Sequence, residues 1–196
     1  MASIVSNLRP RKLNEKPAVF SARIAPALLA ERSSRRNVQS AFARRLLRYA
    51  SEQTFGSGRR IEPDPVTSIS HSANVVLCGL AREGRLGVDV ERIRPRKDWE
   101  ALAQAVLHRV ERQQLAALSE DLRWAGFYRA WTFKEALGKA LGVGLALPFH
   151  QILISEEGLL DEGPGIAGLS GVRWRFRALD AGPGFAAAVA WSEQNG

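Results

Sequence analysis

Residues 86–91 read Leu86-Gly87-Val88-Asp89-Val90-Glu91, and apolar side chains alternate with small or acidic ones along them. Successive side chains of a β-strand point to opposite faces, so this alternation predicts a short strand with one apolar face. Asp89 and Glu91 then share the other face. Two neighbouring carboxylates repel each other and lose hydration unless a cation lies between them. The pattern therefore indicates a site for a hard divalent cation such as magnesium. An edge strand with a solvated acidic face is the alternative.

The composition is that of a globular chain with one core or two small ones, since 45% of its 196 residues are apolar. The single cysteine, Cys78, lies in the apolar run from Val75 to Cys78, which favours core packing over a nucleophile and suits a reducing cytoplasm. No run of apolar residues has the length of a membrane span, and the first residues lack the apolar segment of a secretory signal. We therefore expect a cytoplasmic protein with no membrane partner.

A formal net charge of +8 indicates an anionic partner. Much of it comes from arginines in the first half of the chain, and arginine favours planar and phosphate-like anions. The candidates are a nucleic acid, a nucleotide-like cofactor and an acidic protein. Charge alone leaves all three open, and solvated helix faces would account for many of the arginines. The arginines of the first half include Arg9, Arg11, Arg32, Arg35, Arg36, Arg44, Arg45, Arg48, Arg59 and Arg60.

The first 50 residues predict a loosely ordered lead-in followed by a helix. Residues 1–17 mix Ser, Asn, Pro, Lys and Arg without periodicity. Apolar residues recur at four-residue spacing over 37–50, which is typical of a helix. Arginine at the start of this helix opposes the helix dipole, so a bound phosphate would relieve it. Ordinary surface arginines remain the other interpretation.

Three strands are expected to follow, because residues 66–72, 73–81 and 86–91 are each rich in β-branched or apolar side chains. The tight turn at 82–85 predicts that the last two form a hairpin. His71 lies among Ser68, Ser70 and Ser72, which offer donors to an anion. A structural or solvated histidine is the alternative.

The second half predicts two helices and then a β-rich tail. One helix is expected over 98–118 and another over 122–141, with Gly142 as its stop. In the second helix Trp131, Glu135 and Lys139 follow at four-residue steps and share a face. A surface ion pair between Glu135 and Lys139 would explain two of them, but the large aromatic side chain favours a covered face. Strands are expected at 150–155, 172–177 and 185–191, the last two as a hairpin.

Three segments in this order carry a resemblance to a known family. Residues 68–72 fit S-x-S-H-S, residues 87–91 fit G-[IV]-D-[IV]-E, and residues 131–139 fit W-[ST]-x-K-E-[AS]-x-x-K. This combination resembles the 4'-phosphopantetheinyl transferases of the surfactin-synthetase-activating (Sfp) type. The resemblance implies an α+β fold built as a pseudo-twofold pair of similar α/β subdomains, here 1–85 with its basic lead-in and 86–196, with coenzyme A bound between them.

The resemblance also implies the site residues. Asp89, Glu91 and Glu135 would hold magnesium, or alternatively manganese, against the diphosphate of coenzyme A. His71 and Lys139 would contact phosphates. The base would be Glu135 or Glu111, and the sequence leaves both open. The expected catalytic set is Glu135, Lys139, Glu111 and His71, and the expected cofactor-binding set is Arg36, Arg59, Ser70, His71, Asp89, Lys134 and Lys139.

The implied partner is an acidic apo acyl or peptidyl carrier protein, whose serine receives phosphopantetheine while 3',5'-ADP leaves. Residues 99–118 are a candidate docking surface for it, although their apolar side chains could equally be core. A monomer is expected, because two subdomains in one chain can complete the site. Two alternatives remain: a catalytically inactive protein that binds coenzyme A or a carrier, and a basic nucleic-acid-binding module. The sequence offers no recognised groove-reading motif for the second, and we expect no nucleic-acid partner.

Overall fold

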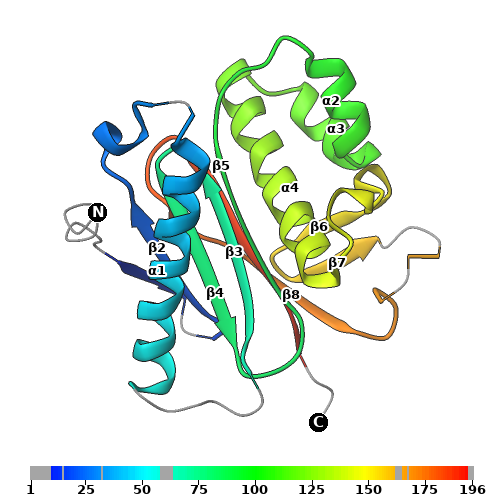
Figure 1. The fold of residues 1–196 in the computed structure, drawn as a ribbon. Helices are drawn as coiled ribbons and strands as arrows, with labels where there is room; N and C mark the ends of the chain where they lie inside the picture. The colour runs from blue at the N-terminus through cyan, green and yellow to red at the C-terminus, as the bar shows by residue number, and fades with distance from the viewer. Residues whose placement is uncertain are drawn as a thin grey trace.

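The computed structural model describes residues 10–14, 16–31, 33–57, 64–161, 165–166 and 168–193. Its first sheet is antiparallel, with strand order β1-β2-β4-β3. Helix α1 (Arg35–Phe55) packs on one face of this sheet (Figure 1). The strands are β1 (Arg11–Asn14), β2 (Ala18–Arg23), β3 (Val66–Ser72) and β4 (Val75–Ala81), and a short 3-10 helix η2 (Pro26–Leu29) follows β2.

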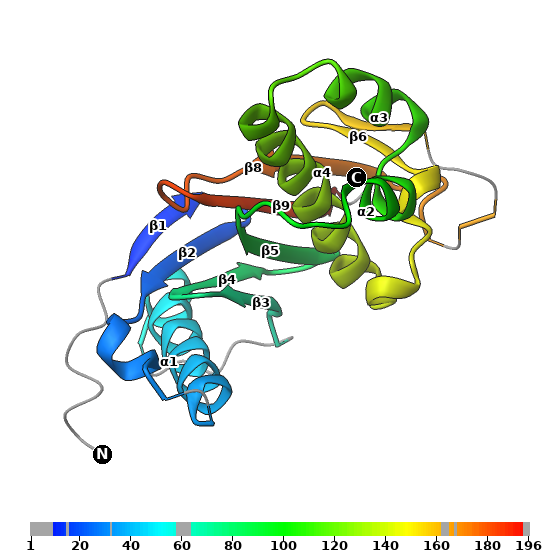
Figure 2. The same ribbon diagram turned by 90° about the horizontal axis from the view of Figure 1, so that it is seen from above.

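A second antiparallel sheet has the order β5-β9-β8, and helix α4 (Glu120–Leu141) packs against it. Figure 2 shows α4 between this sheet and helices α2 and α3. Further elements are β5 (Leu86–Arg92), α2 (Trp99–Val106), α3 (Arg109–Ala116), η3 (Gly144–Ala146), η4 (Phe149–Gln151), β6 (Leu153–Ser155), β7 (Gly158–Asp161), β8 (Arg173–Ala178) and β9 (Phe185–Glu193); β6 and β7 pair with each other.

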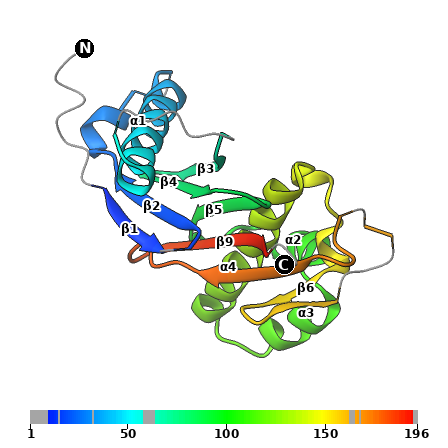
Figure 3. The ribbon, with the colours of Figure 1, turned by 90° about the horizontal axis from the view of Figure 1, so that it is seen from below.

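Figure 3 shows β5 close to the first sheet. The edge strands β3 and β5 are joined by hydrogen bonds from the backbone of β5 to serine side chains of β3. A core shared by both sheets fills the space between them and includes Val19, Leu77, Val88 and Val189. The mixed α/β arrangement confirms the predicted α+β class. The sheets divide at the turn before Leu86, and the subdomain division at residue 85 stays a prediction.

The predicted hairpin between 73–81 and 86–91 is wrong. Strand β5 pairs with β9 along its whole length, from Leu86 opposite Trp191 to Arg92 opposite Phe185. Both edges of β4 are taken, one by β2 and the other by β3. A strand has only two edges for backbone pairing, so β5 crosses to the second sheet. A local turn signal predicted the reversal of the chain but not its new partner.

Two other expectations need correction. The lead-in contains strand β1, which pairs with β2 and was not predicted; residues 1–9 lie outside the described ranges. The helix expected over 98–118 is two helices, because Leu107 is extended and His108 caps α3. Trp99 packs edge-to-face on Trp124 and Phe127, which favours the core interpretation for this part of the candidate docking surface.

The other expected helices and strands are confirmed to within a few residues. Helix α4 ends where Gly142 adopts a left-handed conformation with φ of 75°, as its position in the sequence predicts. Cys78 is fully buried, and burial raises the pKa of its thiol to about 12. None of the helices in the described ranges is both long and apolar enough to span a membrane.

Candidate active site

The site is built where α4 crosses β5, and Gly87 permits the close approach. A Cβ atom at Gly87 would lie 1.8 Å from the carbonyl oxygen of Ala136, so any larger residue would collide with the helix backbone. On β5, Leu86, Val88 and Val90 face the shared core, which directs the alternate side chains toward α4. The glycine of the motif therefore brings Asp89 and Glu91 under the helix that carries Glu135 and Lys139.

Lys139 connects the two elements directly. Its Nζ donates to Asp89 Oδ1 over 2.8 Å and to the carbonyl oxygen of Val88 over 3.1 Å. Asp89 is 4% exposed, and Ser70 Oγ donates to the same Oδ1 over 2.8 Å. Its other oxygen, Oδ2, is buried and has no hydrogen-bond partner among the described residues. A buried carboxylate oxygen is costly to leave unpaired, so Oδ2 is a strong candidate to contact a cation.

Glu91 and Glu135 complete an acidic group with Asp89, which we call the carboxylate cluster. Ser72 Oγ donates to Glu91 Oε2 over 2.8 Å. Burial, and to a smaller extent the charge of Asp89, raises the pKa of Glu91. Burial and then the charge of Asp89 also raise the pKa of Glu135, while Lys139 acts in the opposite direction. The charge of Asp89 thus opposes the ionisation of both glutamates, and the charge of Glu91 opposes that of Glu135.

The carboxylate cluster suits a hard divalent ion in its chemistry, because all its donors are carboxylate oxygens. Within the described ranges, however, no three side chains of the metal-binding types lie close enough together to hold an ion as they stand. Like charges repel, and Lys139 already supplies a counterion to Asp89 Oδ1. The donor set and the unpaired Asp89 Oδ2 fit a metal, although the structure does not bring the three carboxylates together around one point.

His71 lies in a positively charged neighbourhood. Burial lowers its pKa below the ordinary value of 6.5, and the charges of Lys139 and Arg36 lower it further. Lys139 and Arg36 come from opposite sides of the site, because Arg36 opens α1 and Lys139 lies in the last turn of α4. The charges of Lys139 and Arg36 thus both reach the imidazole of His71, and the three side chains form a basic group. Such a group can bind an anion with several negative charges.

Glu111 and Lys134, which were both expected in the active site, form a buried ion pair with each other. Lys134 is fully buried, and its Nζ donates to Glu111 Oε2 over 2.5 Å and to the carbonyl oxygen of Val106 over 2.8 Å. Glu111 Oε2 also accepts the backbone N–H of His108 in the capping box of α3. These bonds occupy the groups expected to bind cofactor and to act as a base, and favour a structural role.

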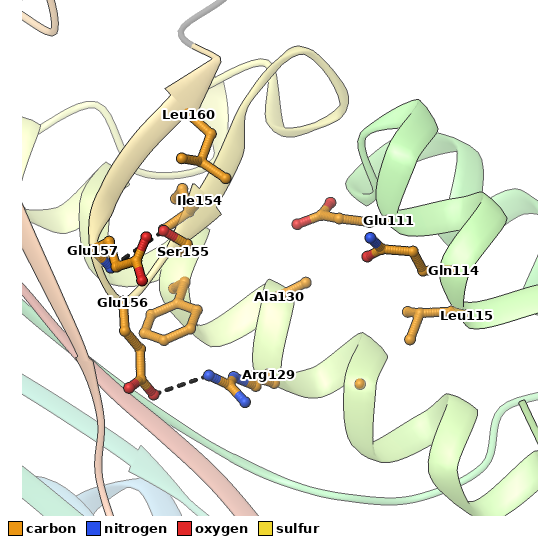
Figure 4. Close-up of a pocket in the computed structure, with 12 residues that line it drawn as sticks. Glu111, Gln114, Leu115, Arg129, Ala130, Ile154, Ser155, Glu156, Glu157 and Leu160 are labelled. Atoms are coloured by element: carbon orange, nitrogen blue, oxygen red, sulfur yellow. Dashed lines mark hydrogen bonds and ion pairs between the residues drawn. The ribbon is translucent and has the colours of Figure 1, made fainter.

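Glu111 lines a groove that contains none of the three residues of the carboxylate cluster. The groove has a volume of about 430 Å³ and lies between α3, α4 and the β6–β7 hairpin (Figure 4). Glu111 points into it, and Arg129 and Ala130 form its floor on α4. Helical periodicity places Gly126 and Ala130, which line the groove, on the side of α4 away from Lys139, while Arg129 lies about a quarter turn from it. Glu111 is therefore on the far side of α4 from the candidate site.

Two expected residues remain, Ser70 and Arg59, and only Ser70 lies in the described ranges. Ser70 is buried, and its hydroxyl is used by Asp89 Oδ1 and by the backbone N–H of Val90, which argues against contact with a cofactor. Arg59 lies outside the described residues. The contact that sequence reasoning missed is the one from Ser72 to Glu91. The alternation of serines at 68, 70 and 72 could have indicated this contact, because the three side chains share one face of a strand.

Comparison with known proteins gives a family match. Residues 85–190 match the family model described as the 4'-phosphopantetheinyl transferase superfamily. The 4'-phosphopantetheinyl transferase AcpT of Salmonella typhi is 40% identical over 75 residues, which are 38% of this chain and 39% of that protein. The 4'-phosphopantetheinyl transferase Sfp of Bacillus subtilis (strain 168) is 33% identical over 92 residues, which are 47% of this chain and 40% of that protein.

The chain thus spans about two fifths of the length of these curated relatives. Among solved structures, a holo-(acyl-carrier-protein) synthase from Bacillus anthracis str. Ames in complex with CoA (3',5'-ADP) aligns with a TM-score of 0.46 and 19% identity. That alignment covers 57% of this chain and 96% of the synthase.

Proposed function

The chain belongs to the 4'-phosphopantetheinyl transferase superfamily, and from this we infer that it transfers the 4'-phosphopantetheine group of coenzyme A to a serine of an apo carrier protein. The main support for this proposal is the contact between β5 and α4. There Lys139 donates to Asp89 of the carboxylate cluster, and the charge of Lys139 also reaches His71. A site with both signs of charge suits a diphosphate whose charge must be neutralised and whose position must be fixed.

The proposed reaction is a displacement at phosphorus. The hydroxyl oxygen of the carrier serine forms a bond to the β-phosphorus of coenzyme A. The bond from that phosphorus to the bridging oxygen breaks, and 3',5'-ADP leaves with the electron pair. The serine proton passes to a base on the enzyme. Because the substrate is a diphosphate, the enzyme mainly contributes positioning and electrostatic stabilisation.

Lys139 is the first candidate to stabilise this charge. It is 29% exposed at its side chain and is held by Asp89 and the Val88 carbonyl group, so its ammonium is oriented before a substrate arrives. His71 and Arg36 add donors from the other side of the site. A neutral imidazole can donate one hydrogen bond, and a guanidinium can contact two phosphate oxygens at once.

We assign magnesium, or alternatively manganese, to Asp89, Glu91 and Glu135. When bound, such an ion would neutralise the charge of the diphosphate as a Lewis acid. The support is the buried Asp89 Oδ2, which has no hydrogen-bond partner among the described residues, and the charge of Asp89, which raises the pKa of Glu91 and of Glu135 in addition to burial. A few protein oxygens leave coordination positions for phosphate oxygens and water, which is the usual arrangement for magnesium with phosphate substrates.

Glu135 is the better candidate for the base. Its carboxylate is half-buried beside Asp89, whereas Glu111 is paired with Lys134 on the other side of α4. A base must lie within hydrogen-bond reach of the proton it takes, directly or through one water. Glu135 meets this requirement for a substrate bound next to Asp89, and Glu111 does not.

The partner we propose is an acidic acyl or peptidyl carrier protein that meets a monomeric enzyme in the cytoplasm. A net charge of +8 would steer an acidic protein toward the enzyme and make the association rate depend on salt. The Sfp type is also a proposal. Its support is the three ordered motifs and the alignment with Sfp, but AcpT aligns as well.

The experiment is to incubate the chain with coenzyme A, magnesium and a panel of apo carrier proteins from fatty-acid, polyketide and peptide synthesis. Intact-mass spectrometry would follow each carrier. We expect at least one carrier to gain the mass of one phosphopantetheine group, with 3',5'-ADP formed in equal amount. Binding of coenzyme A or a carrier without any mass gain would instead identify an inactive relative. Asp89→Asn is the matched loss-of-function variant, because it keeps the size of the side chain.

A further inference from the structure

Along the edge of β5 that faces β3, backbone N–H groups donate hydrogen bonds to side chains of β3. Three backbone N–H groups on this edge, those of Val88, Val90 and Arg92, donate to serine hydroxyls over 3.0, 3.3 and 3.0 Å. The acceptors are Ser68, Ser70 and Ser72 of β3, which we call the serine ladder. Backbone N–H groups that are left unpaired away from water are costly. The serine ladder therefore joins the two sheets in place of a strand-to-strand ladder.

Two of these hydroxyls have a second bond, to a carboxylate. Ser70 donates to Asp89 Oδ1 and Ser72 to Glu91 Oε2, both over 2.8 Å. A hydroxyl has one proton to donate and lone pairs to accept with. In Ser70 and Ser72 the proton goes to the carboxylate, and a lone pair receives the backbone N–H. The direction of each hydroxyl is therefore fixed by two bonds.

We propose that Ser70 and Ser72 are positioning residues that hold the carboxylates of Asp89 and Glu91 in the orientation needed to bind a divalent cation. The inference rests on the proposed function and deepens it, because it assigns the serines of the S-x-S-H-S segment to the metal site and not to coenzyme A. Each serine contacts one oxygen of its carboxylate. In Asp89 this leaves the buried Oδ2 as the oxygen with no partner among the described residues.

Outer hydrogen bonds of this kind orient metal ligands, and their loss typically lowers metal affinity or activity by about 10- to 100-fold. Burial supports the assignment to positioning. Ser70 is 7% exposed and has both of its bonds inside the protein. Ser72 is only part-buried, so a substitution there disturbs packing less and gives the cleaner test.

Ser68 provides a matched control within the same ladder. It accepts the backbone N–H of Val88, just as Ser72 accepts that of Arg92, and both distances are 3.0 Å. The Cβ of Ser68 points to the same face of β3 as that of Ser72. Its contact with β5 is made through the backbone of Val88, whereas Ser72 also donates to Glu91. Ser68→Ala and Ser72→Ala thus remove equivalent backbone bonds, and only the second removes this carboxylate bond.

The experiment measures Mn²⁺ binding to the full chain by titration calorimetry, with and without coenzyme A, and thermal unfolding of the same samples. We expect both alanine variants to lower the unfolding midpoint by similar amounts. Ser72→Ala should weaken Mn²⁺ binding by about 10- to 100-fold, and Ser68→Ala should change it by less than about twofold. Ser72→Thr keeps the hydroxyl and should restore most of the affinity.

Three results would overturn the proposal: unchanged Mn²⁺ affinity in Ser72→Ala, an equal loss in Ser68→Ala, or no Mn²⁺ binding by the unaltered chain under either condition. The outcome for the proposed function is separate. A chain that shows the expected order of Mn²⁺ affinities but modifies no carrier would refute the transferase activity while supporting the positioning role. If the chain modifies carriers but Ser72→Ala binds Mn²⁺ normally, the transferase activity is supported and the positioning role is refuted.

Discussion

The ammonium of Lys139 lies 2.8 Å from Oδ1 of Asp89, although 50 residues separate them in the chain. The same ammonium donates to the carbonyl oxygen of Val88. Lys139 therefore fixes the last turn of α4 over β5, and it places the positive charge of one motif on the negative charge of another. This contact makes the two motifs parts of one site.

Lys139→Met should lose most of the proposed transfer activity, by about 100- to 1000-fold in kcat, because it removes a fixed charge from the proposed diphosphate site. Stability should fall by about 2 kcal/mol, since Asp89 loses a charged hydrogen-bond partner. Steady-state kinetics and urea unfolding measure the two effects. Arg129→Met is the control, because Arg129 lines the groove beside Glu111 and pairs there with exposed Glu156. A normal kcat in Lys139→Met would contradict the role given to this residue.

Gly87→Ala should destabilise the protein by about 3 kcal/mol or more, because the new methyl group would overlap the Ala136 carbonyl oxygen and force α4 away from β5. Gly126→Ala is the matched control. Its methyl group would meet the end of the Leu115 side chain, which can rotate away, and alanine is the better helix former. Chemical unfolding compares the two. Equal losses would show that the contact between α4 and β5 is not the tight one described.

Lys134→Met should cost about 3–5 kcal/mol, because it leaves the Glu111 carboxylate buried without its partner. The double change Lys134→Met with Glu111→Leu should recover much of that stability. If Glu111 is structural, the double variant also keeps measurable transfer activity at a temperature where it is folded. Activity that vanishes in a well-folded double variant would return Glu111 to the candidates for the base.

Glu135→Gln should raise the thermal midpoint of the metal-free protein while abolishing the proposed transfer, since it removes a partly buried charge that Asp89 and Glu91 repel. The folded state raises the pKa of Glu135 above the ordinary value of 4.5, mainly through burial. As pH rises above 4.5 the unfolded chain ionises first, so stability falls until the pH passes the raised pKa. Glu135→Gln should flatten this part of the stability profile. A lower midpoint at neutral pH would contradict the described repulsion.

The sequence predicted the elements of the site better than their connections. Alternation identified β5, and four-residue spacing identified the face of α4 that carries Glu135 and Lys139, because both patterns are local. The partner of β5 could not be found in this way. It pairs with β9, about 100 residues away, and only the full use of both β4 edges excludes the expected hairpin.

The same limit applies to two side chains. The sequence placed Lys134 in the site because it belongs to a recognised motif, and Glu111 because the family resemblance implied it as a possible base. It could not show that they pair with each other beneath α3, because that depends on a helix break at His108. The serine spacing of residues 68–72 was visible, but its meaning depends on β5 lying beside β3.

The most direct test of the account is the anomalous diffraction of crystals grown with coenzyme A and Mn²⁺. We predict one manganese peak per chain, in contact with Asp89, Glu91 and Glu135 and with the diphosphate of coenzyme A. Coenzyme A bound at this site with the manganese elsewhere, or with Glu135 turned away from the ion, would contradict the central claim.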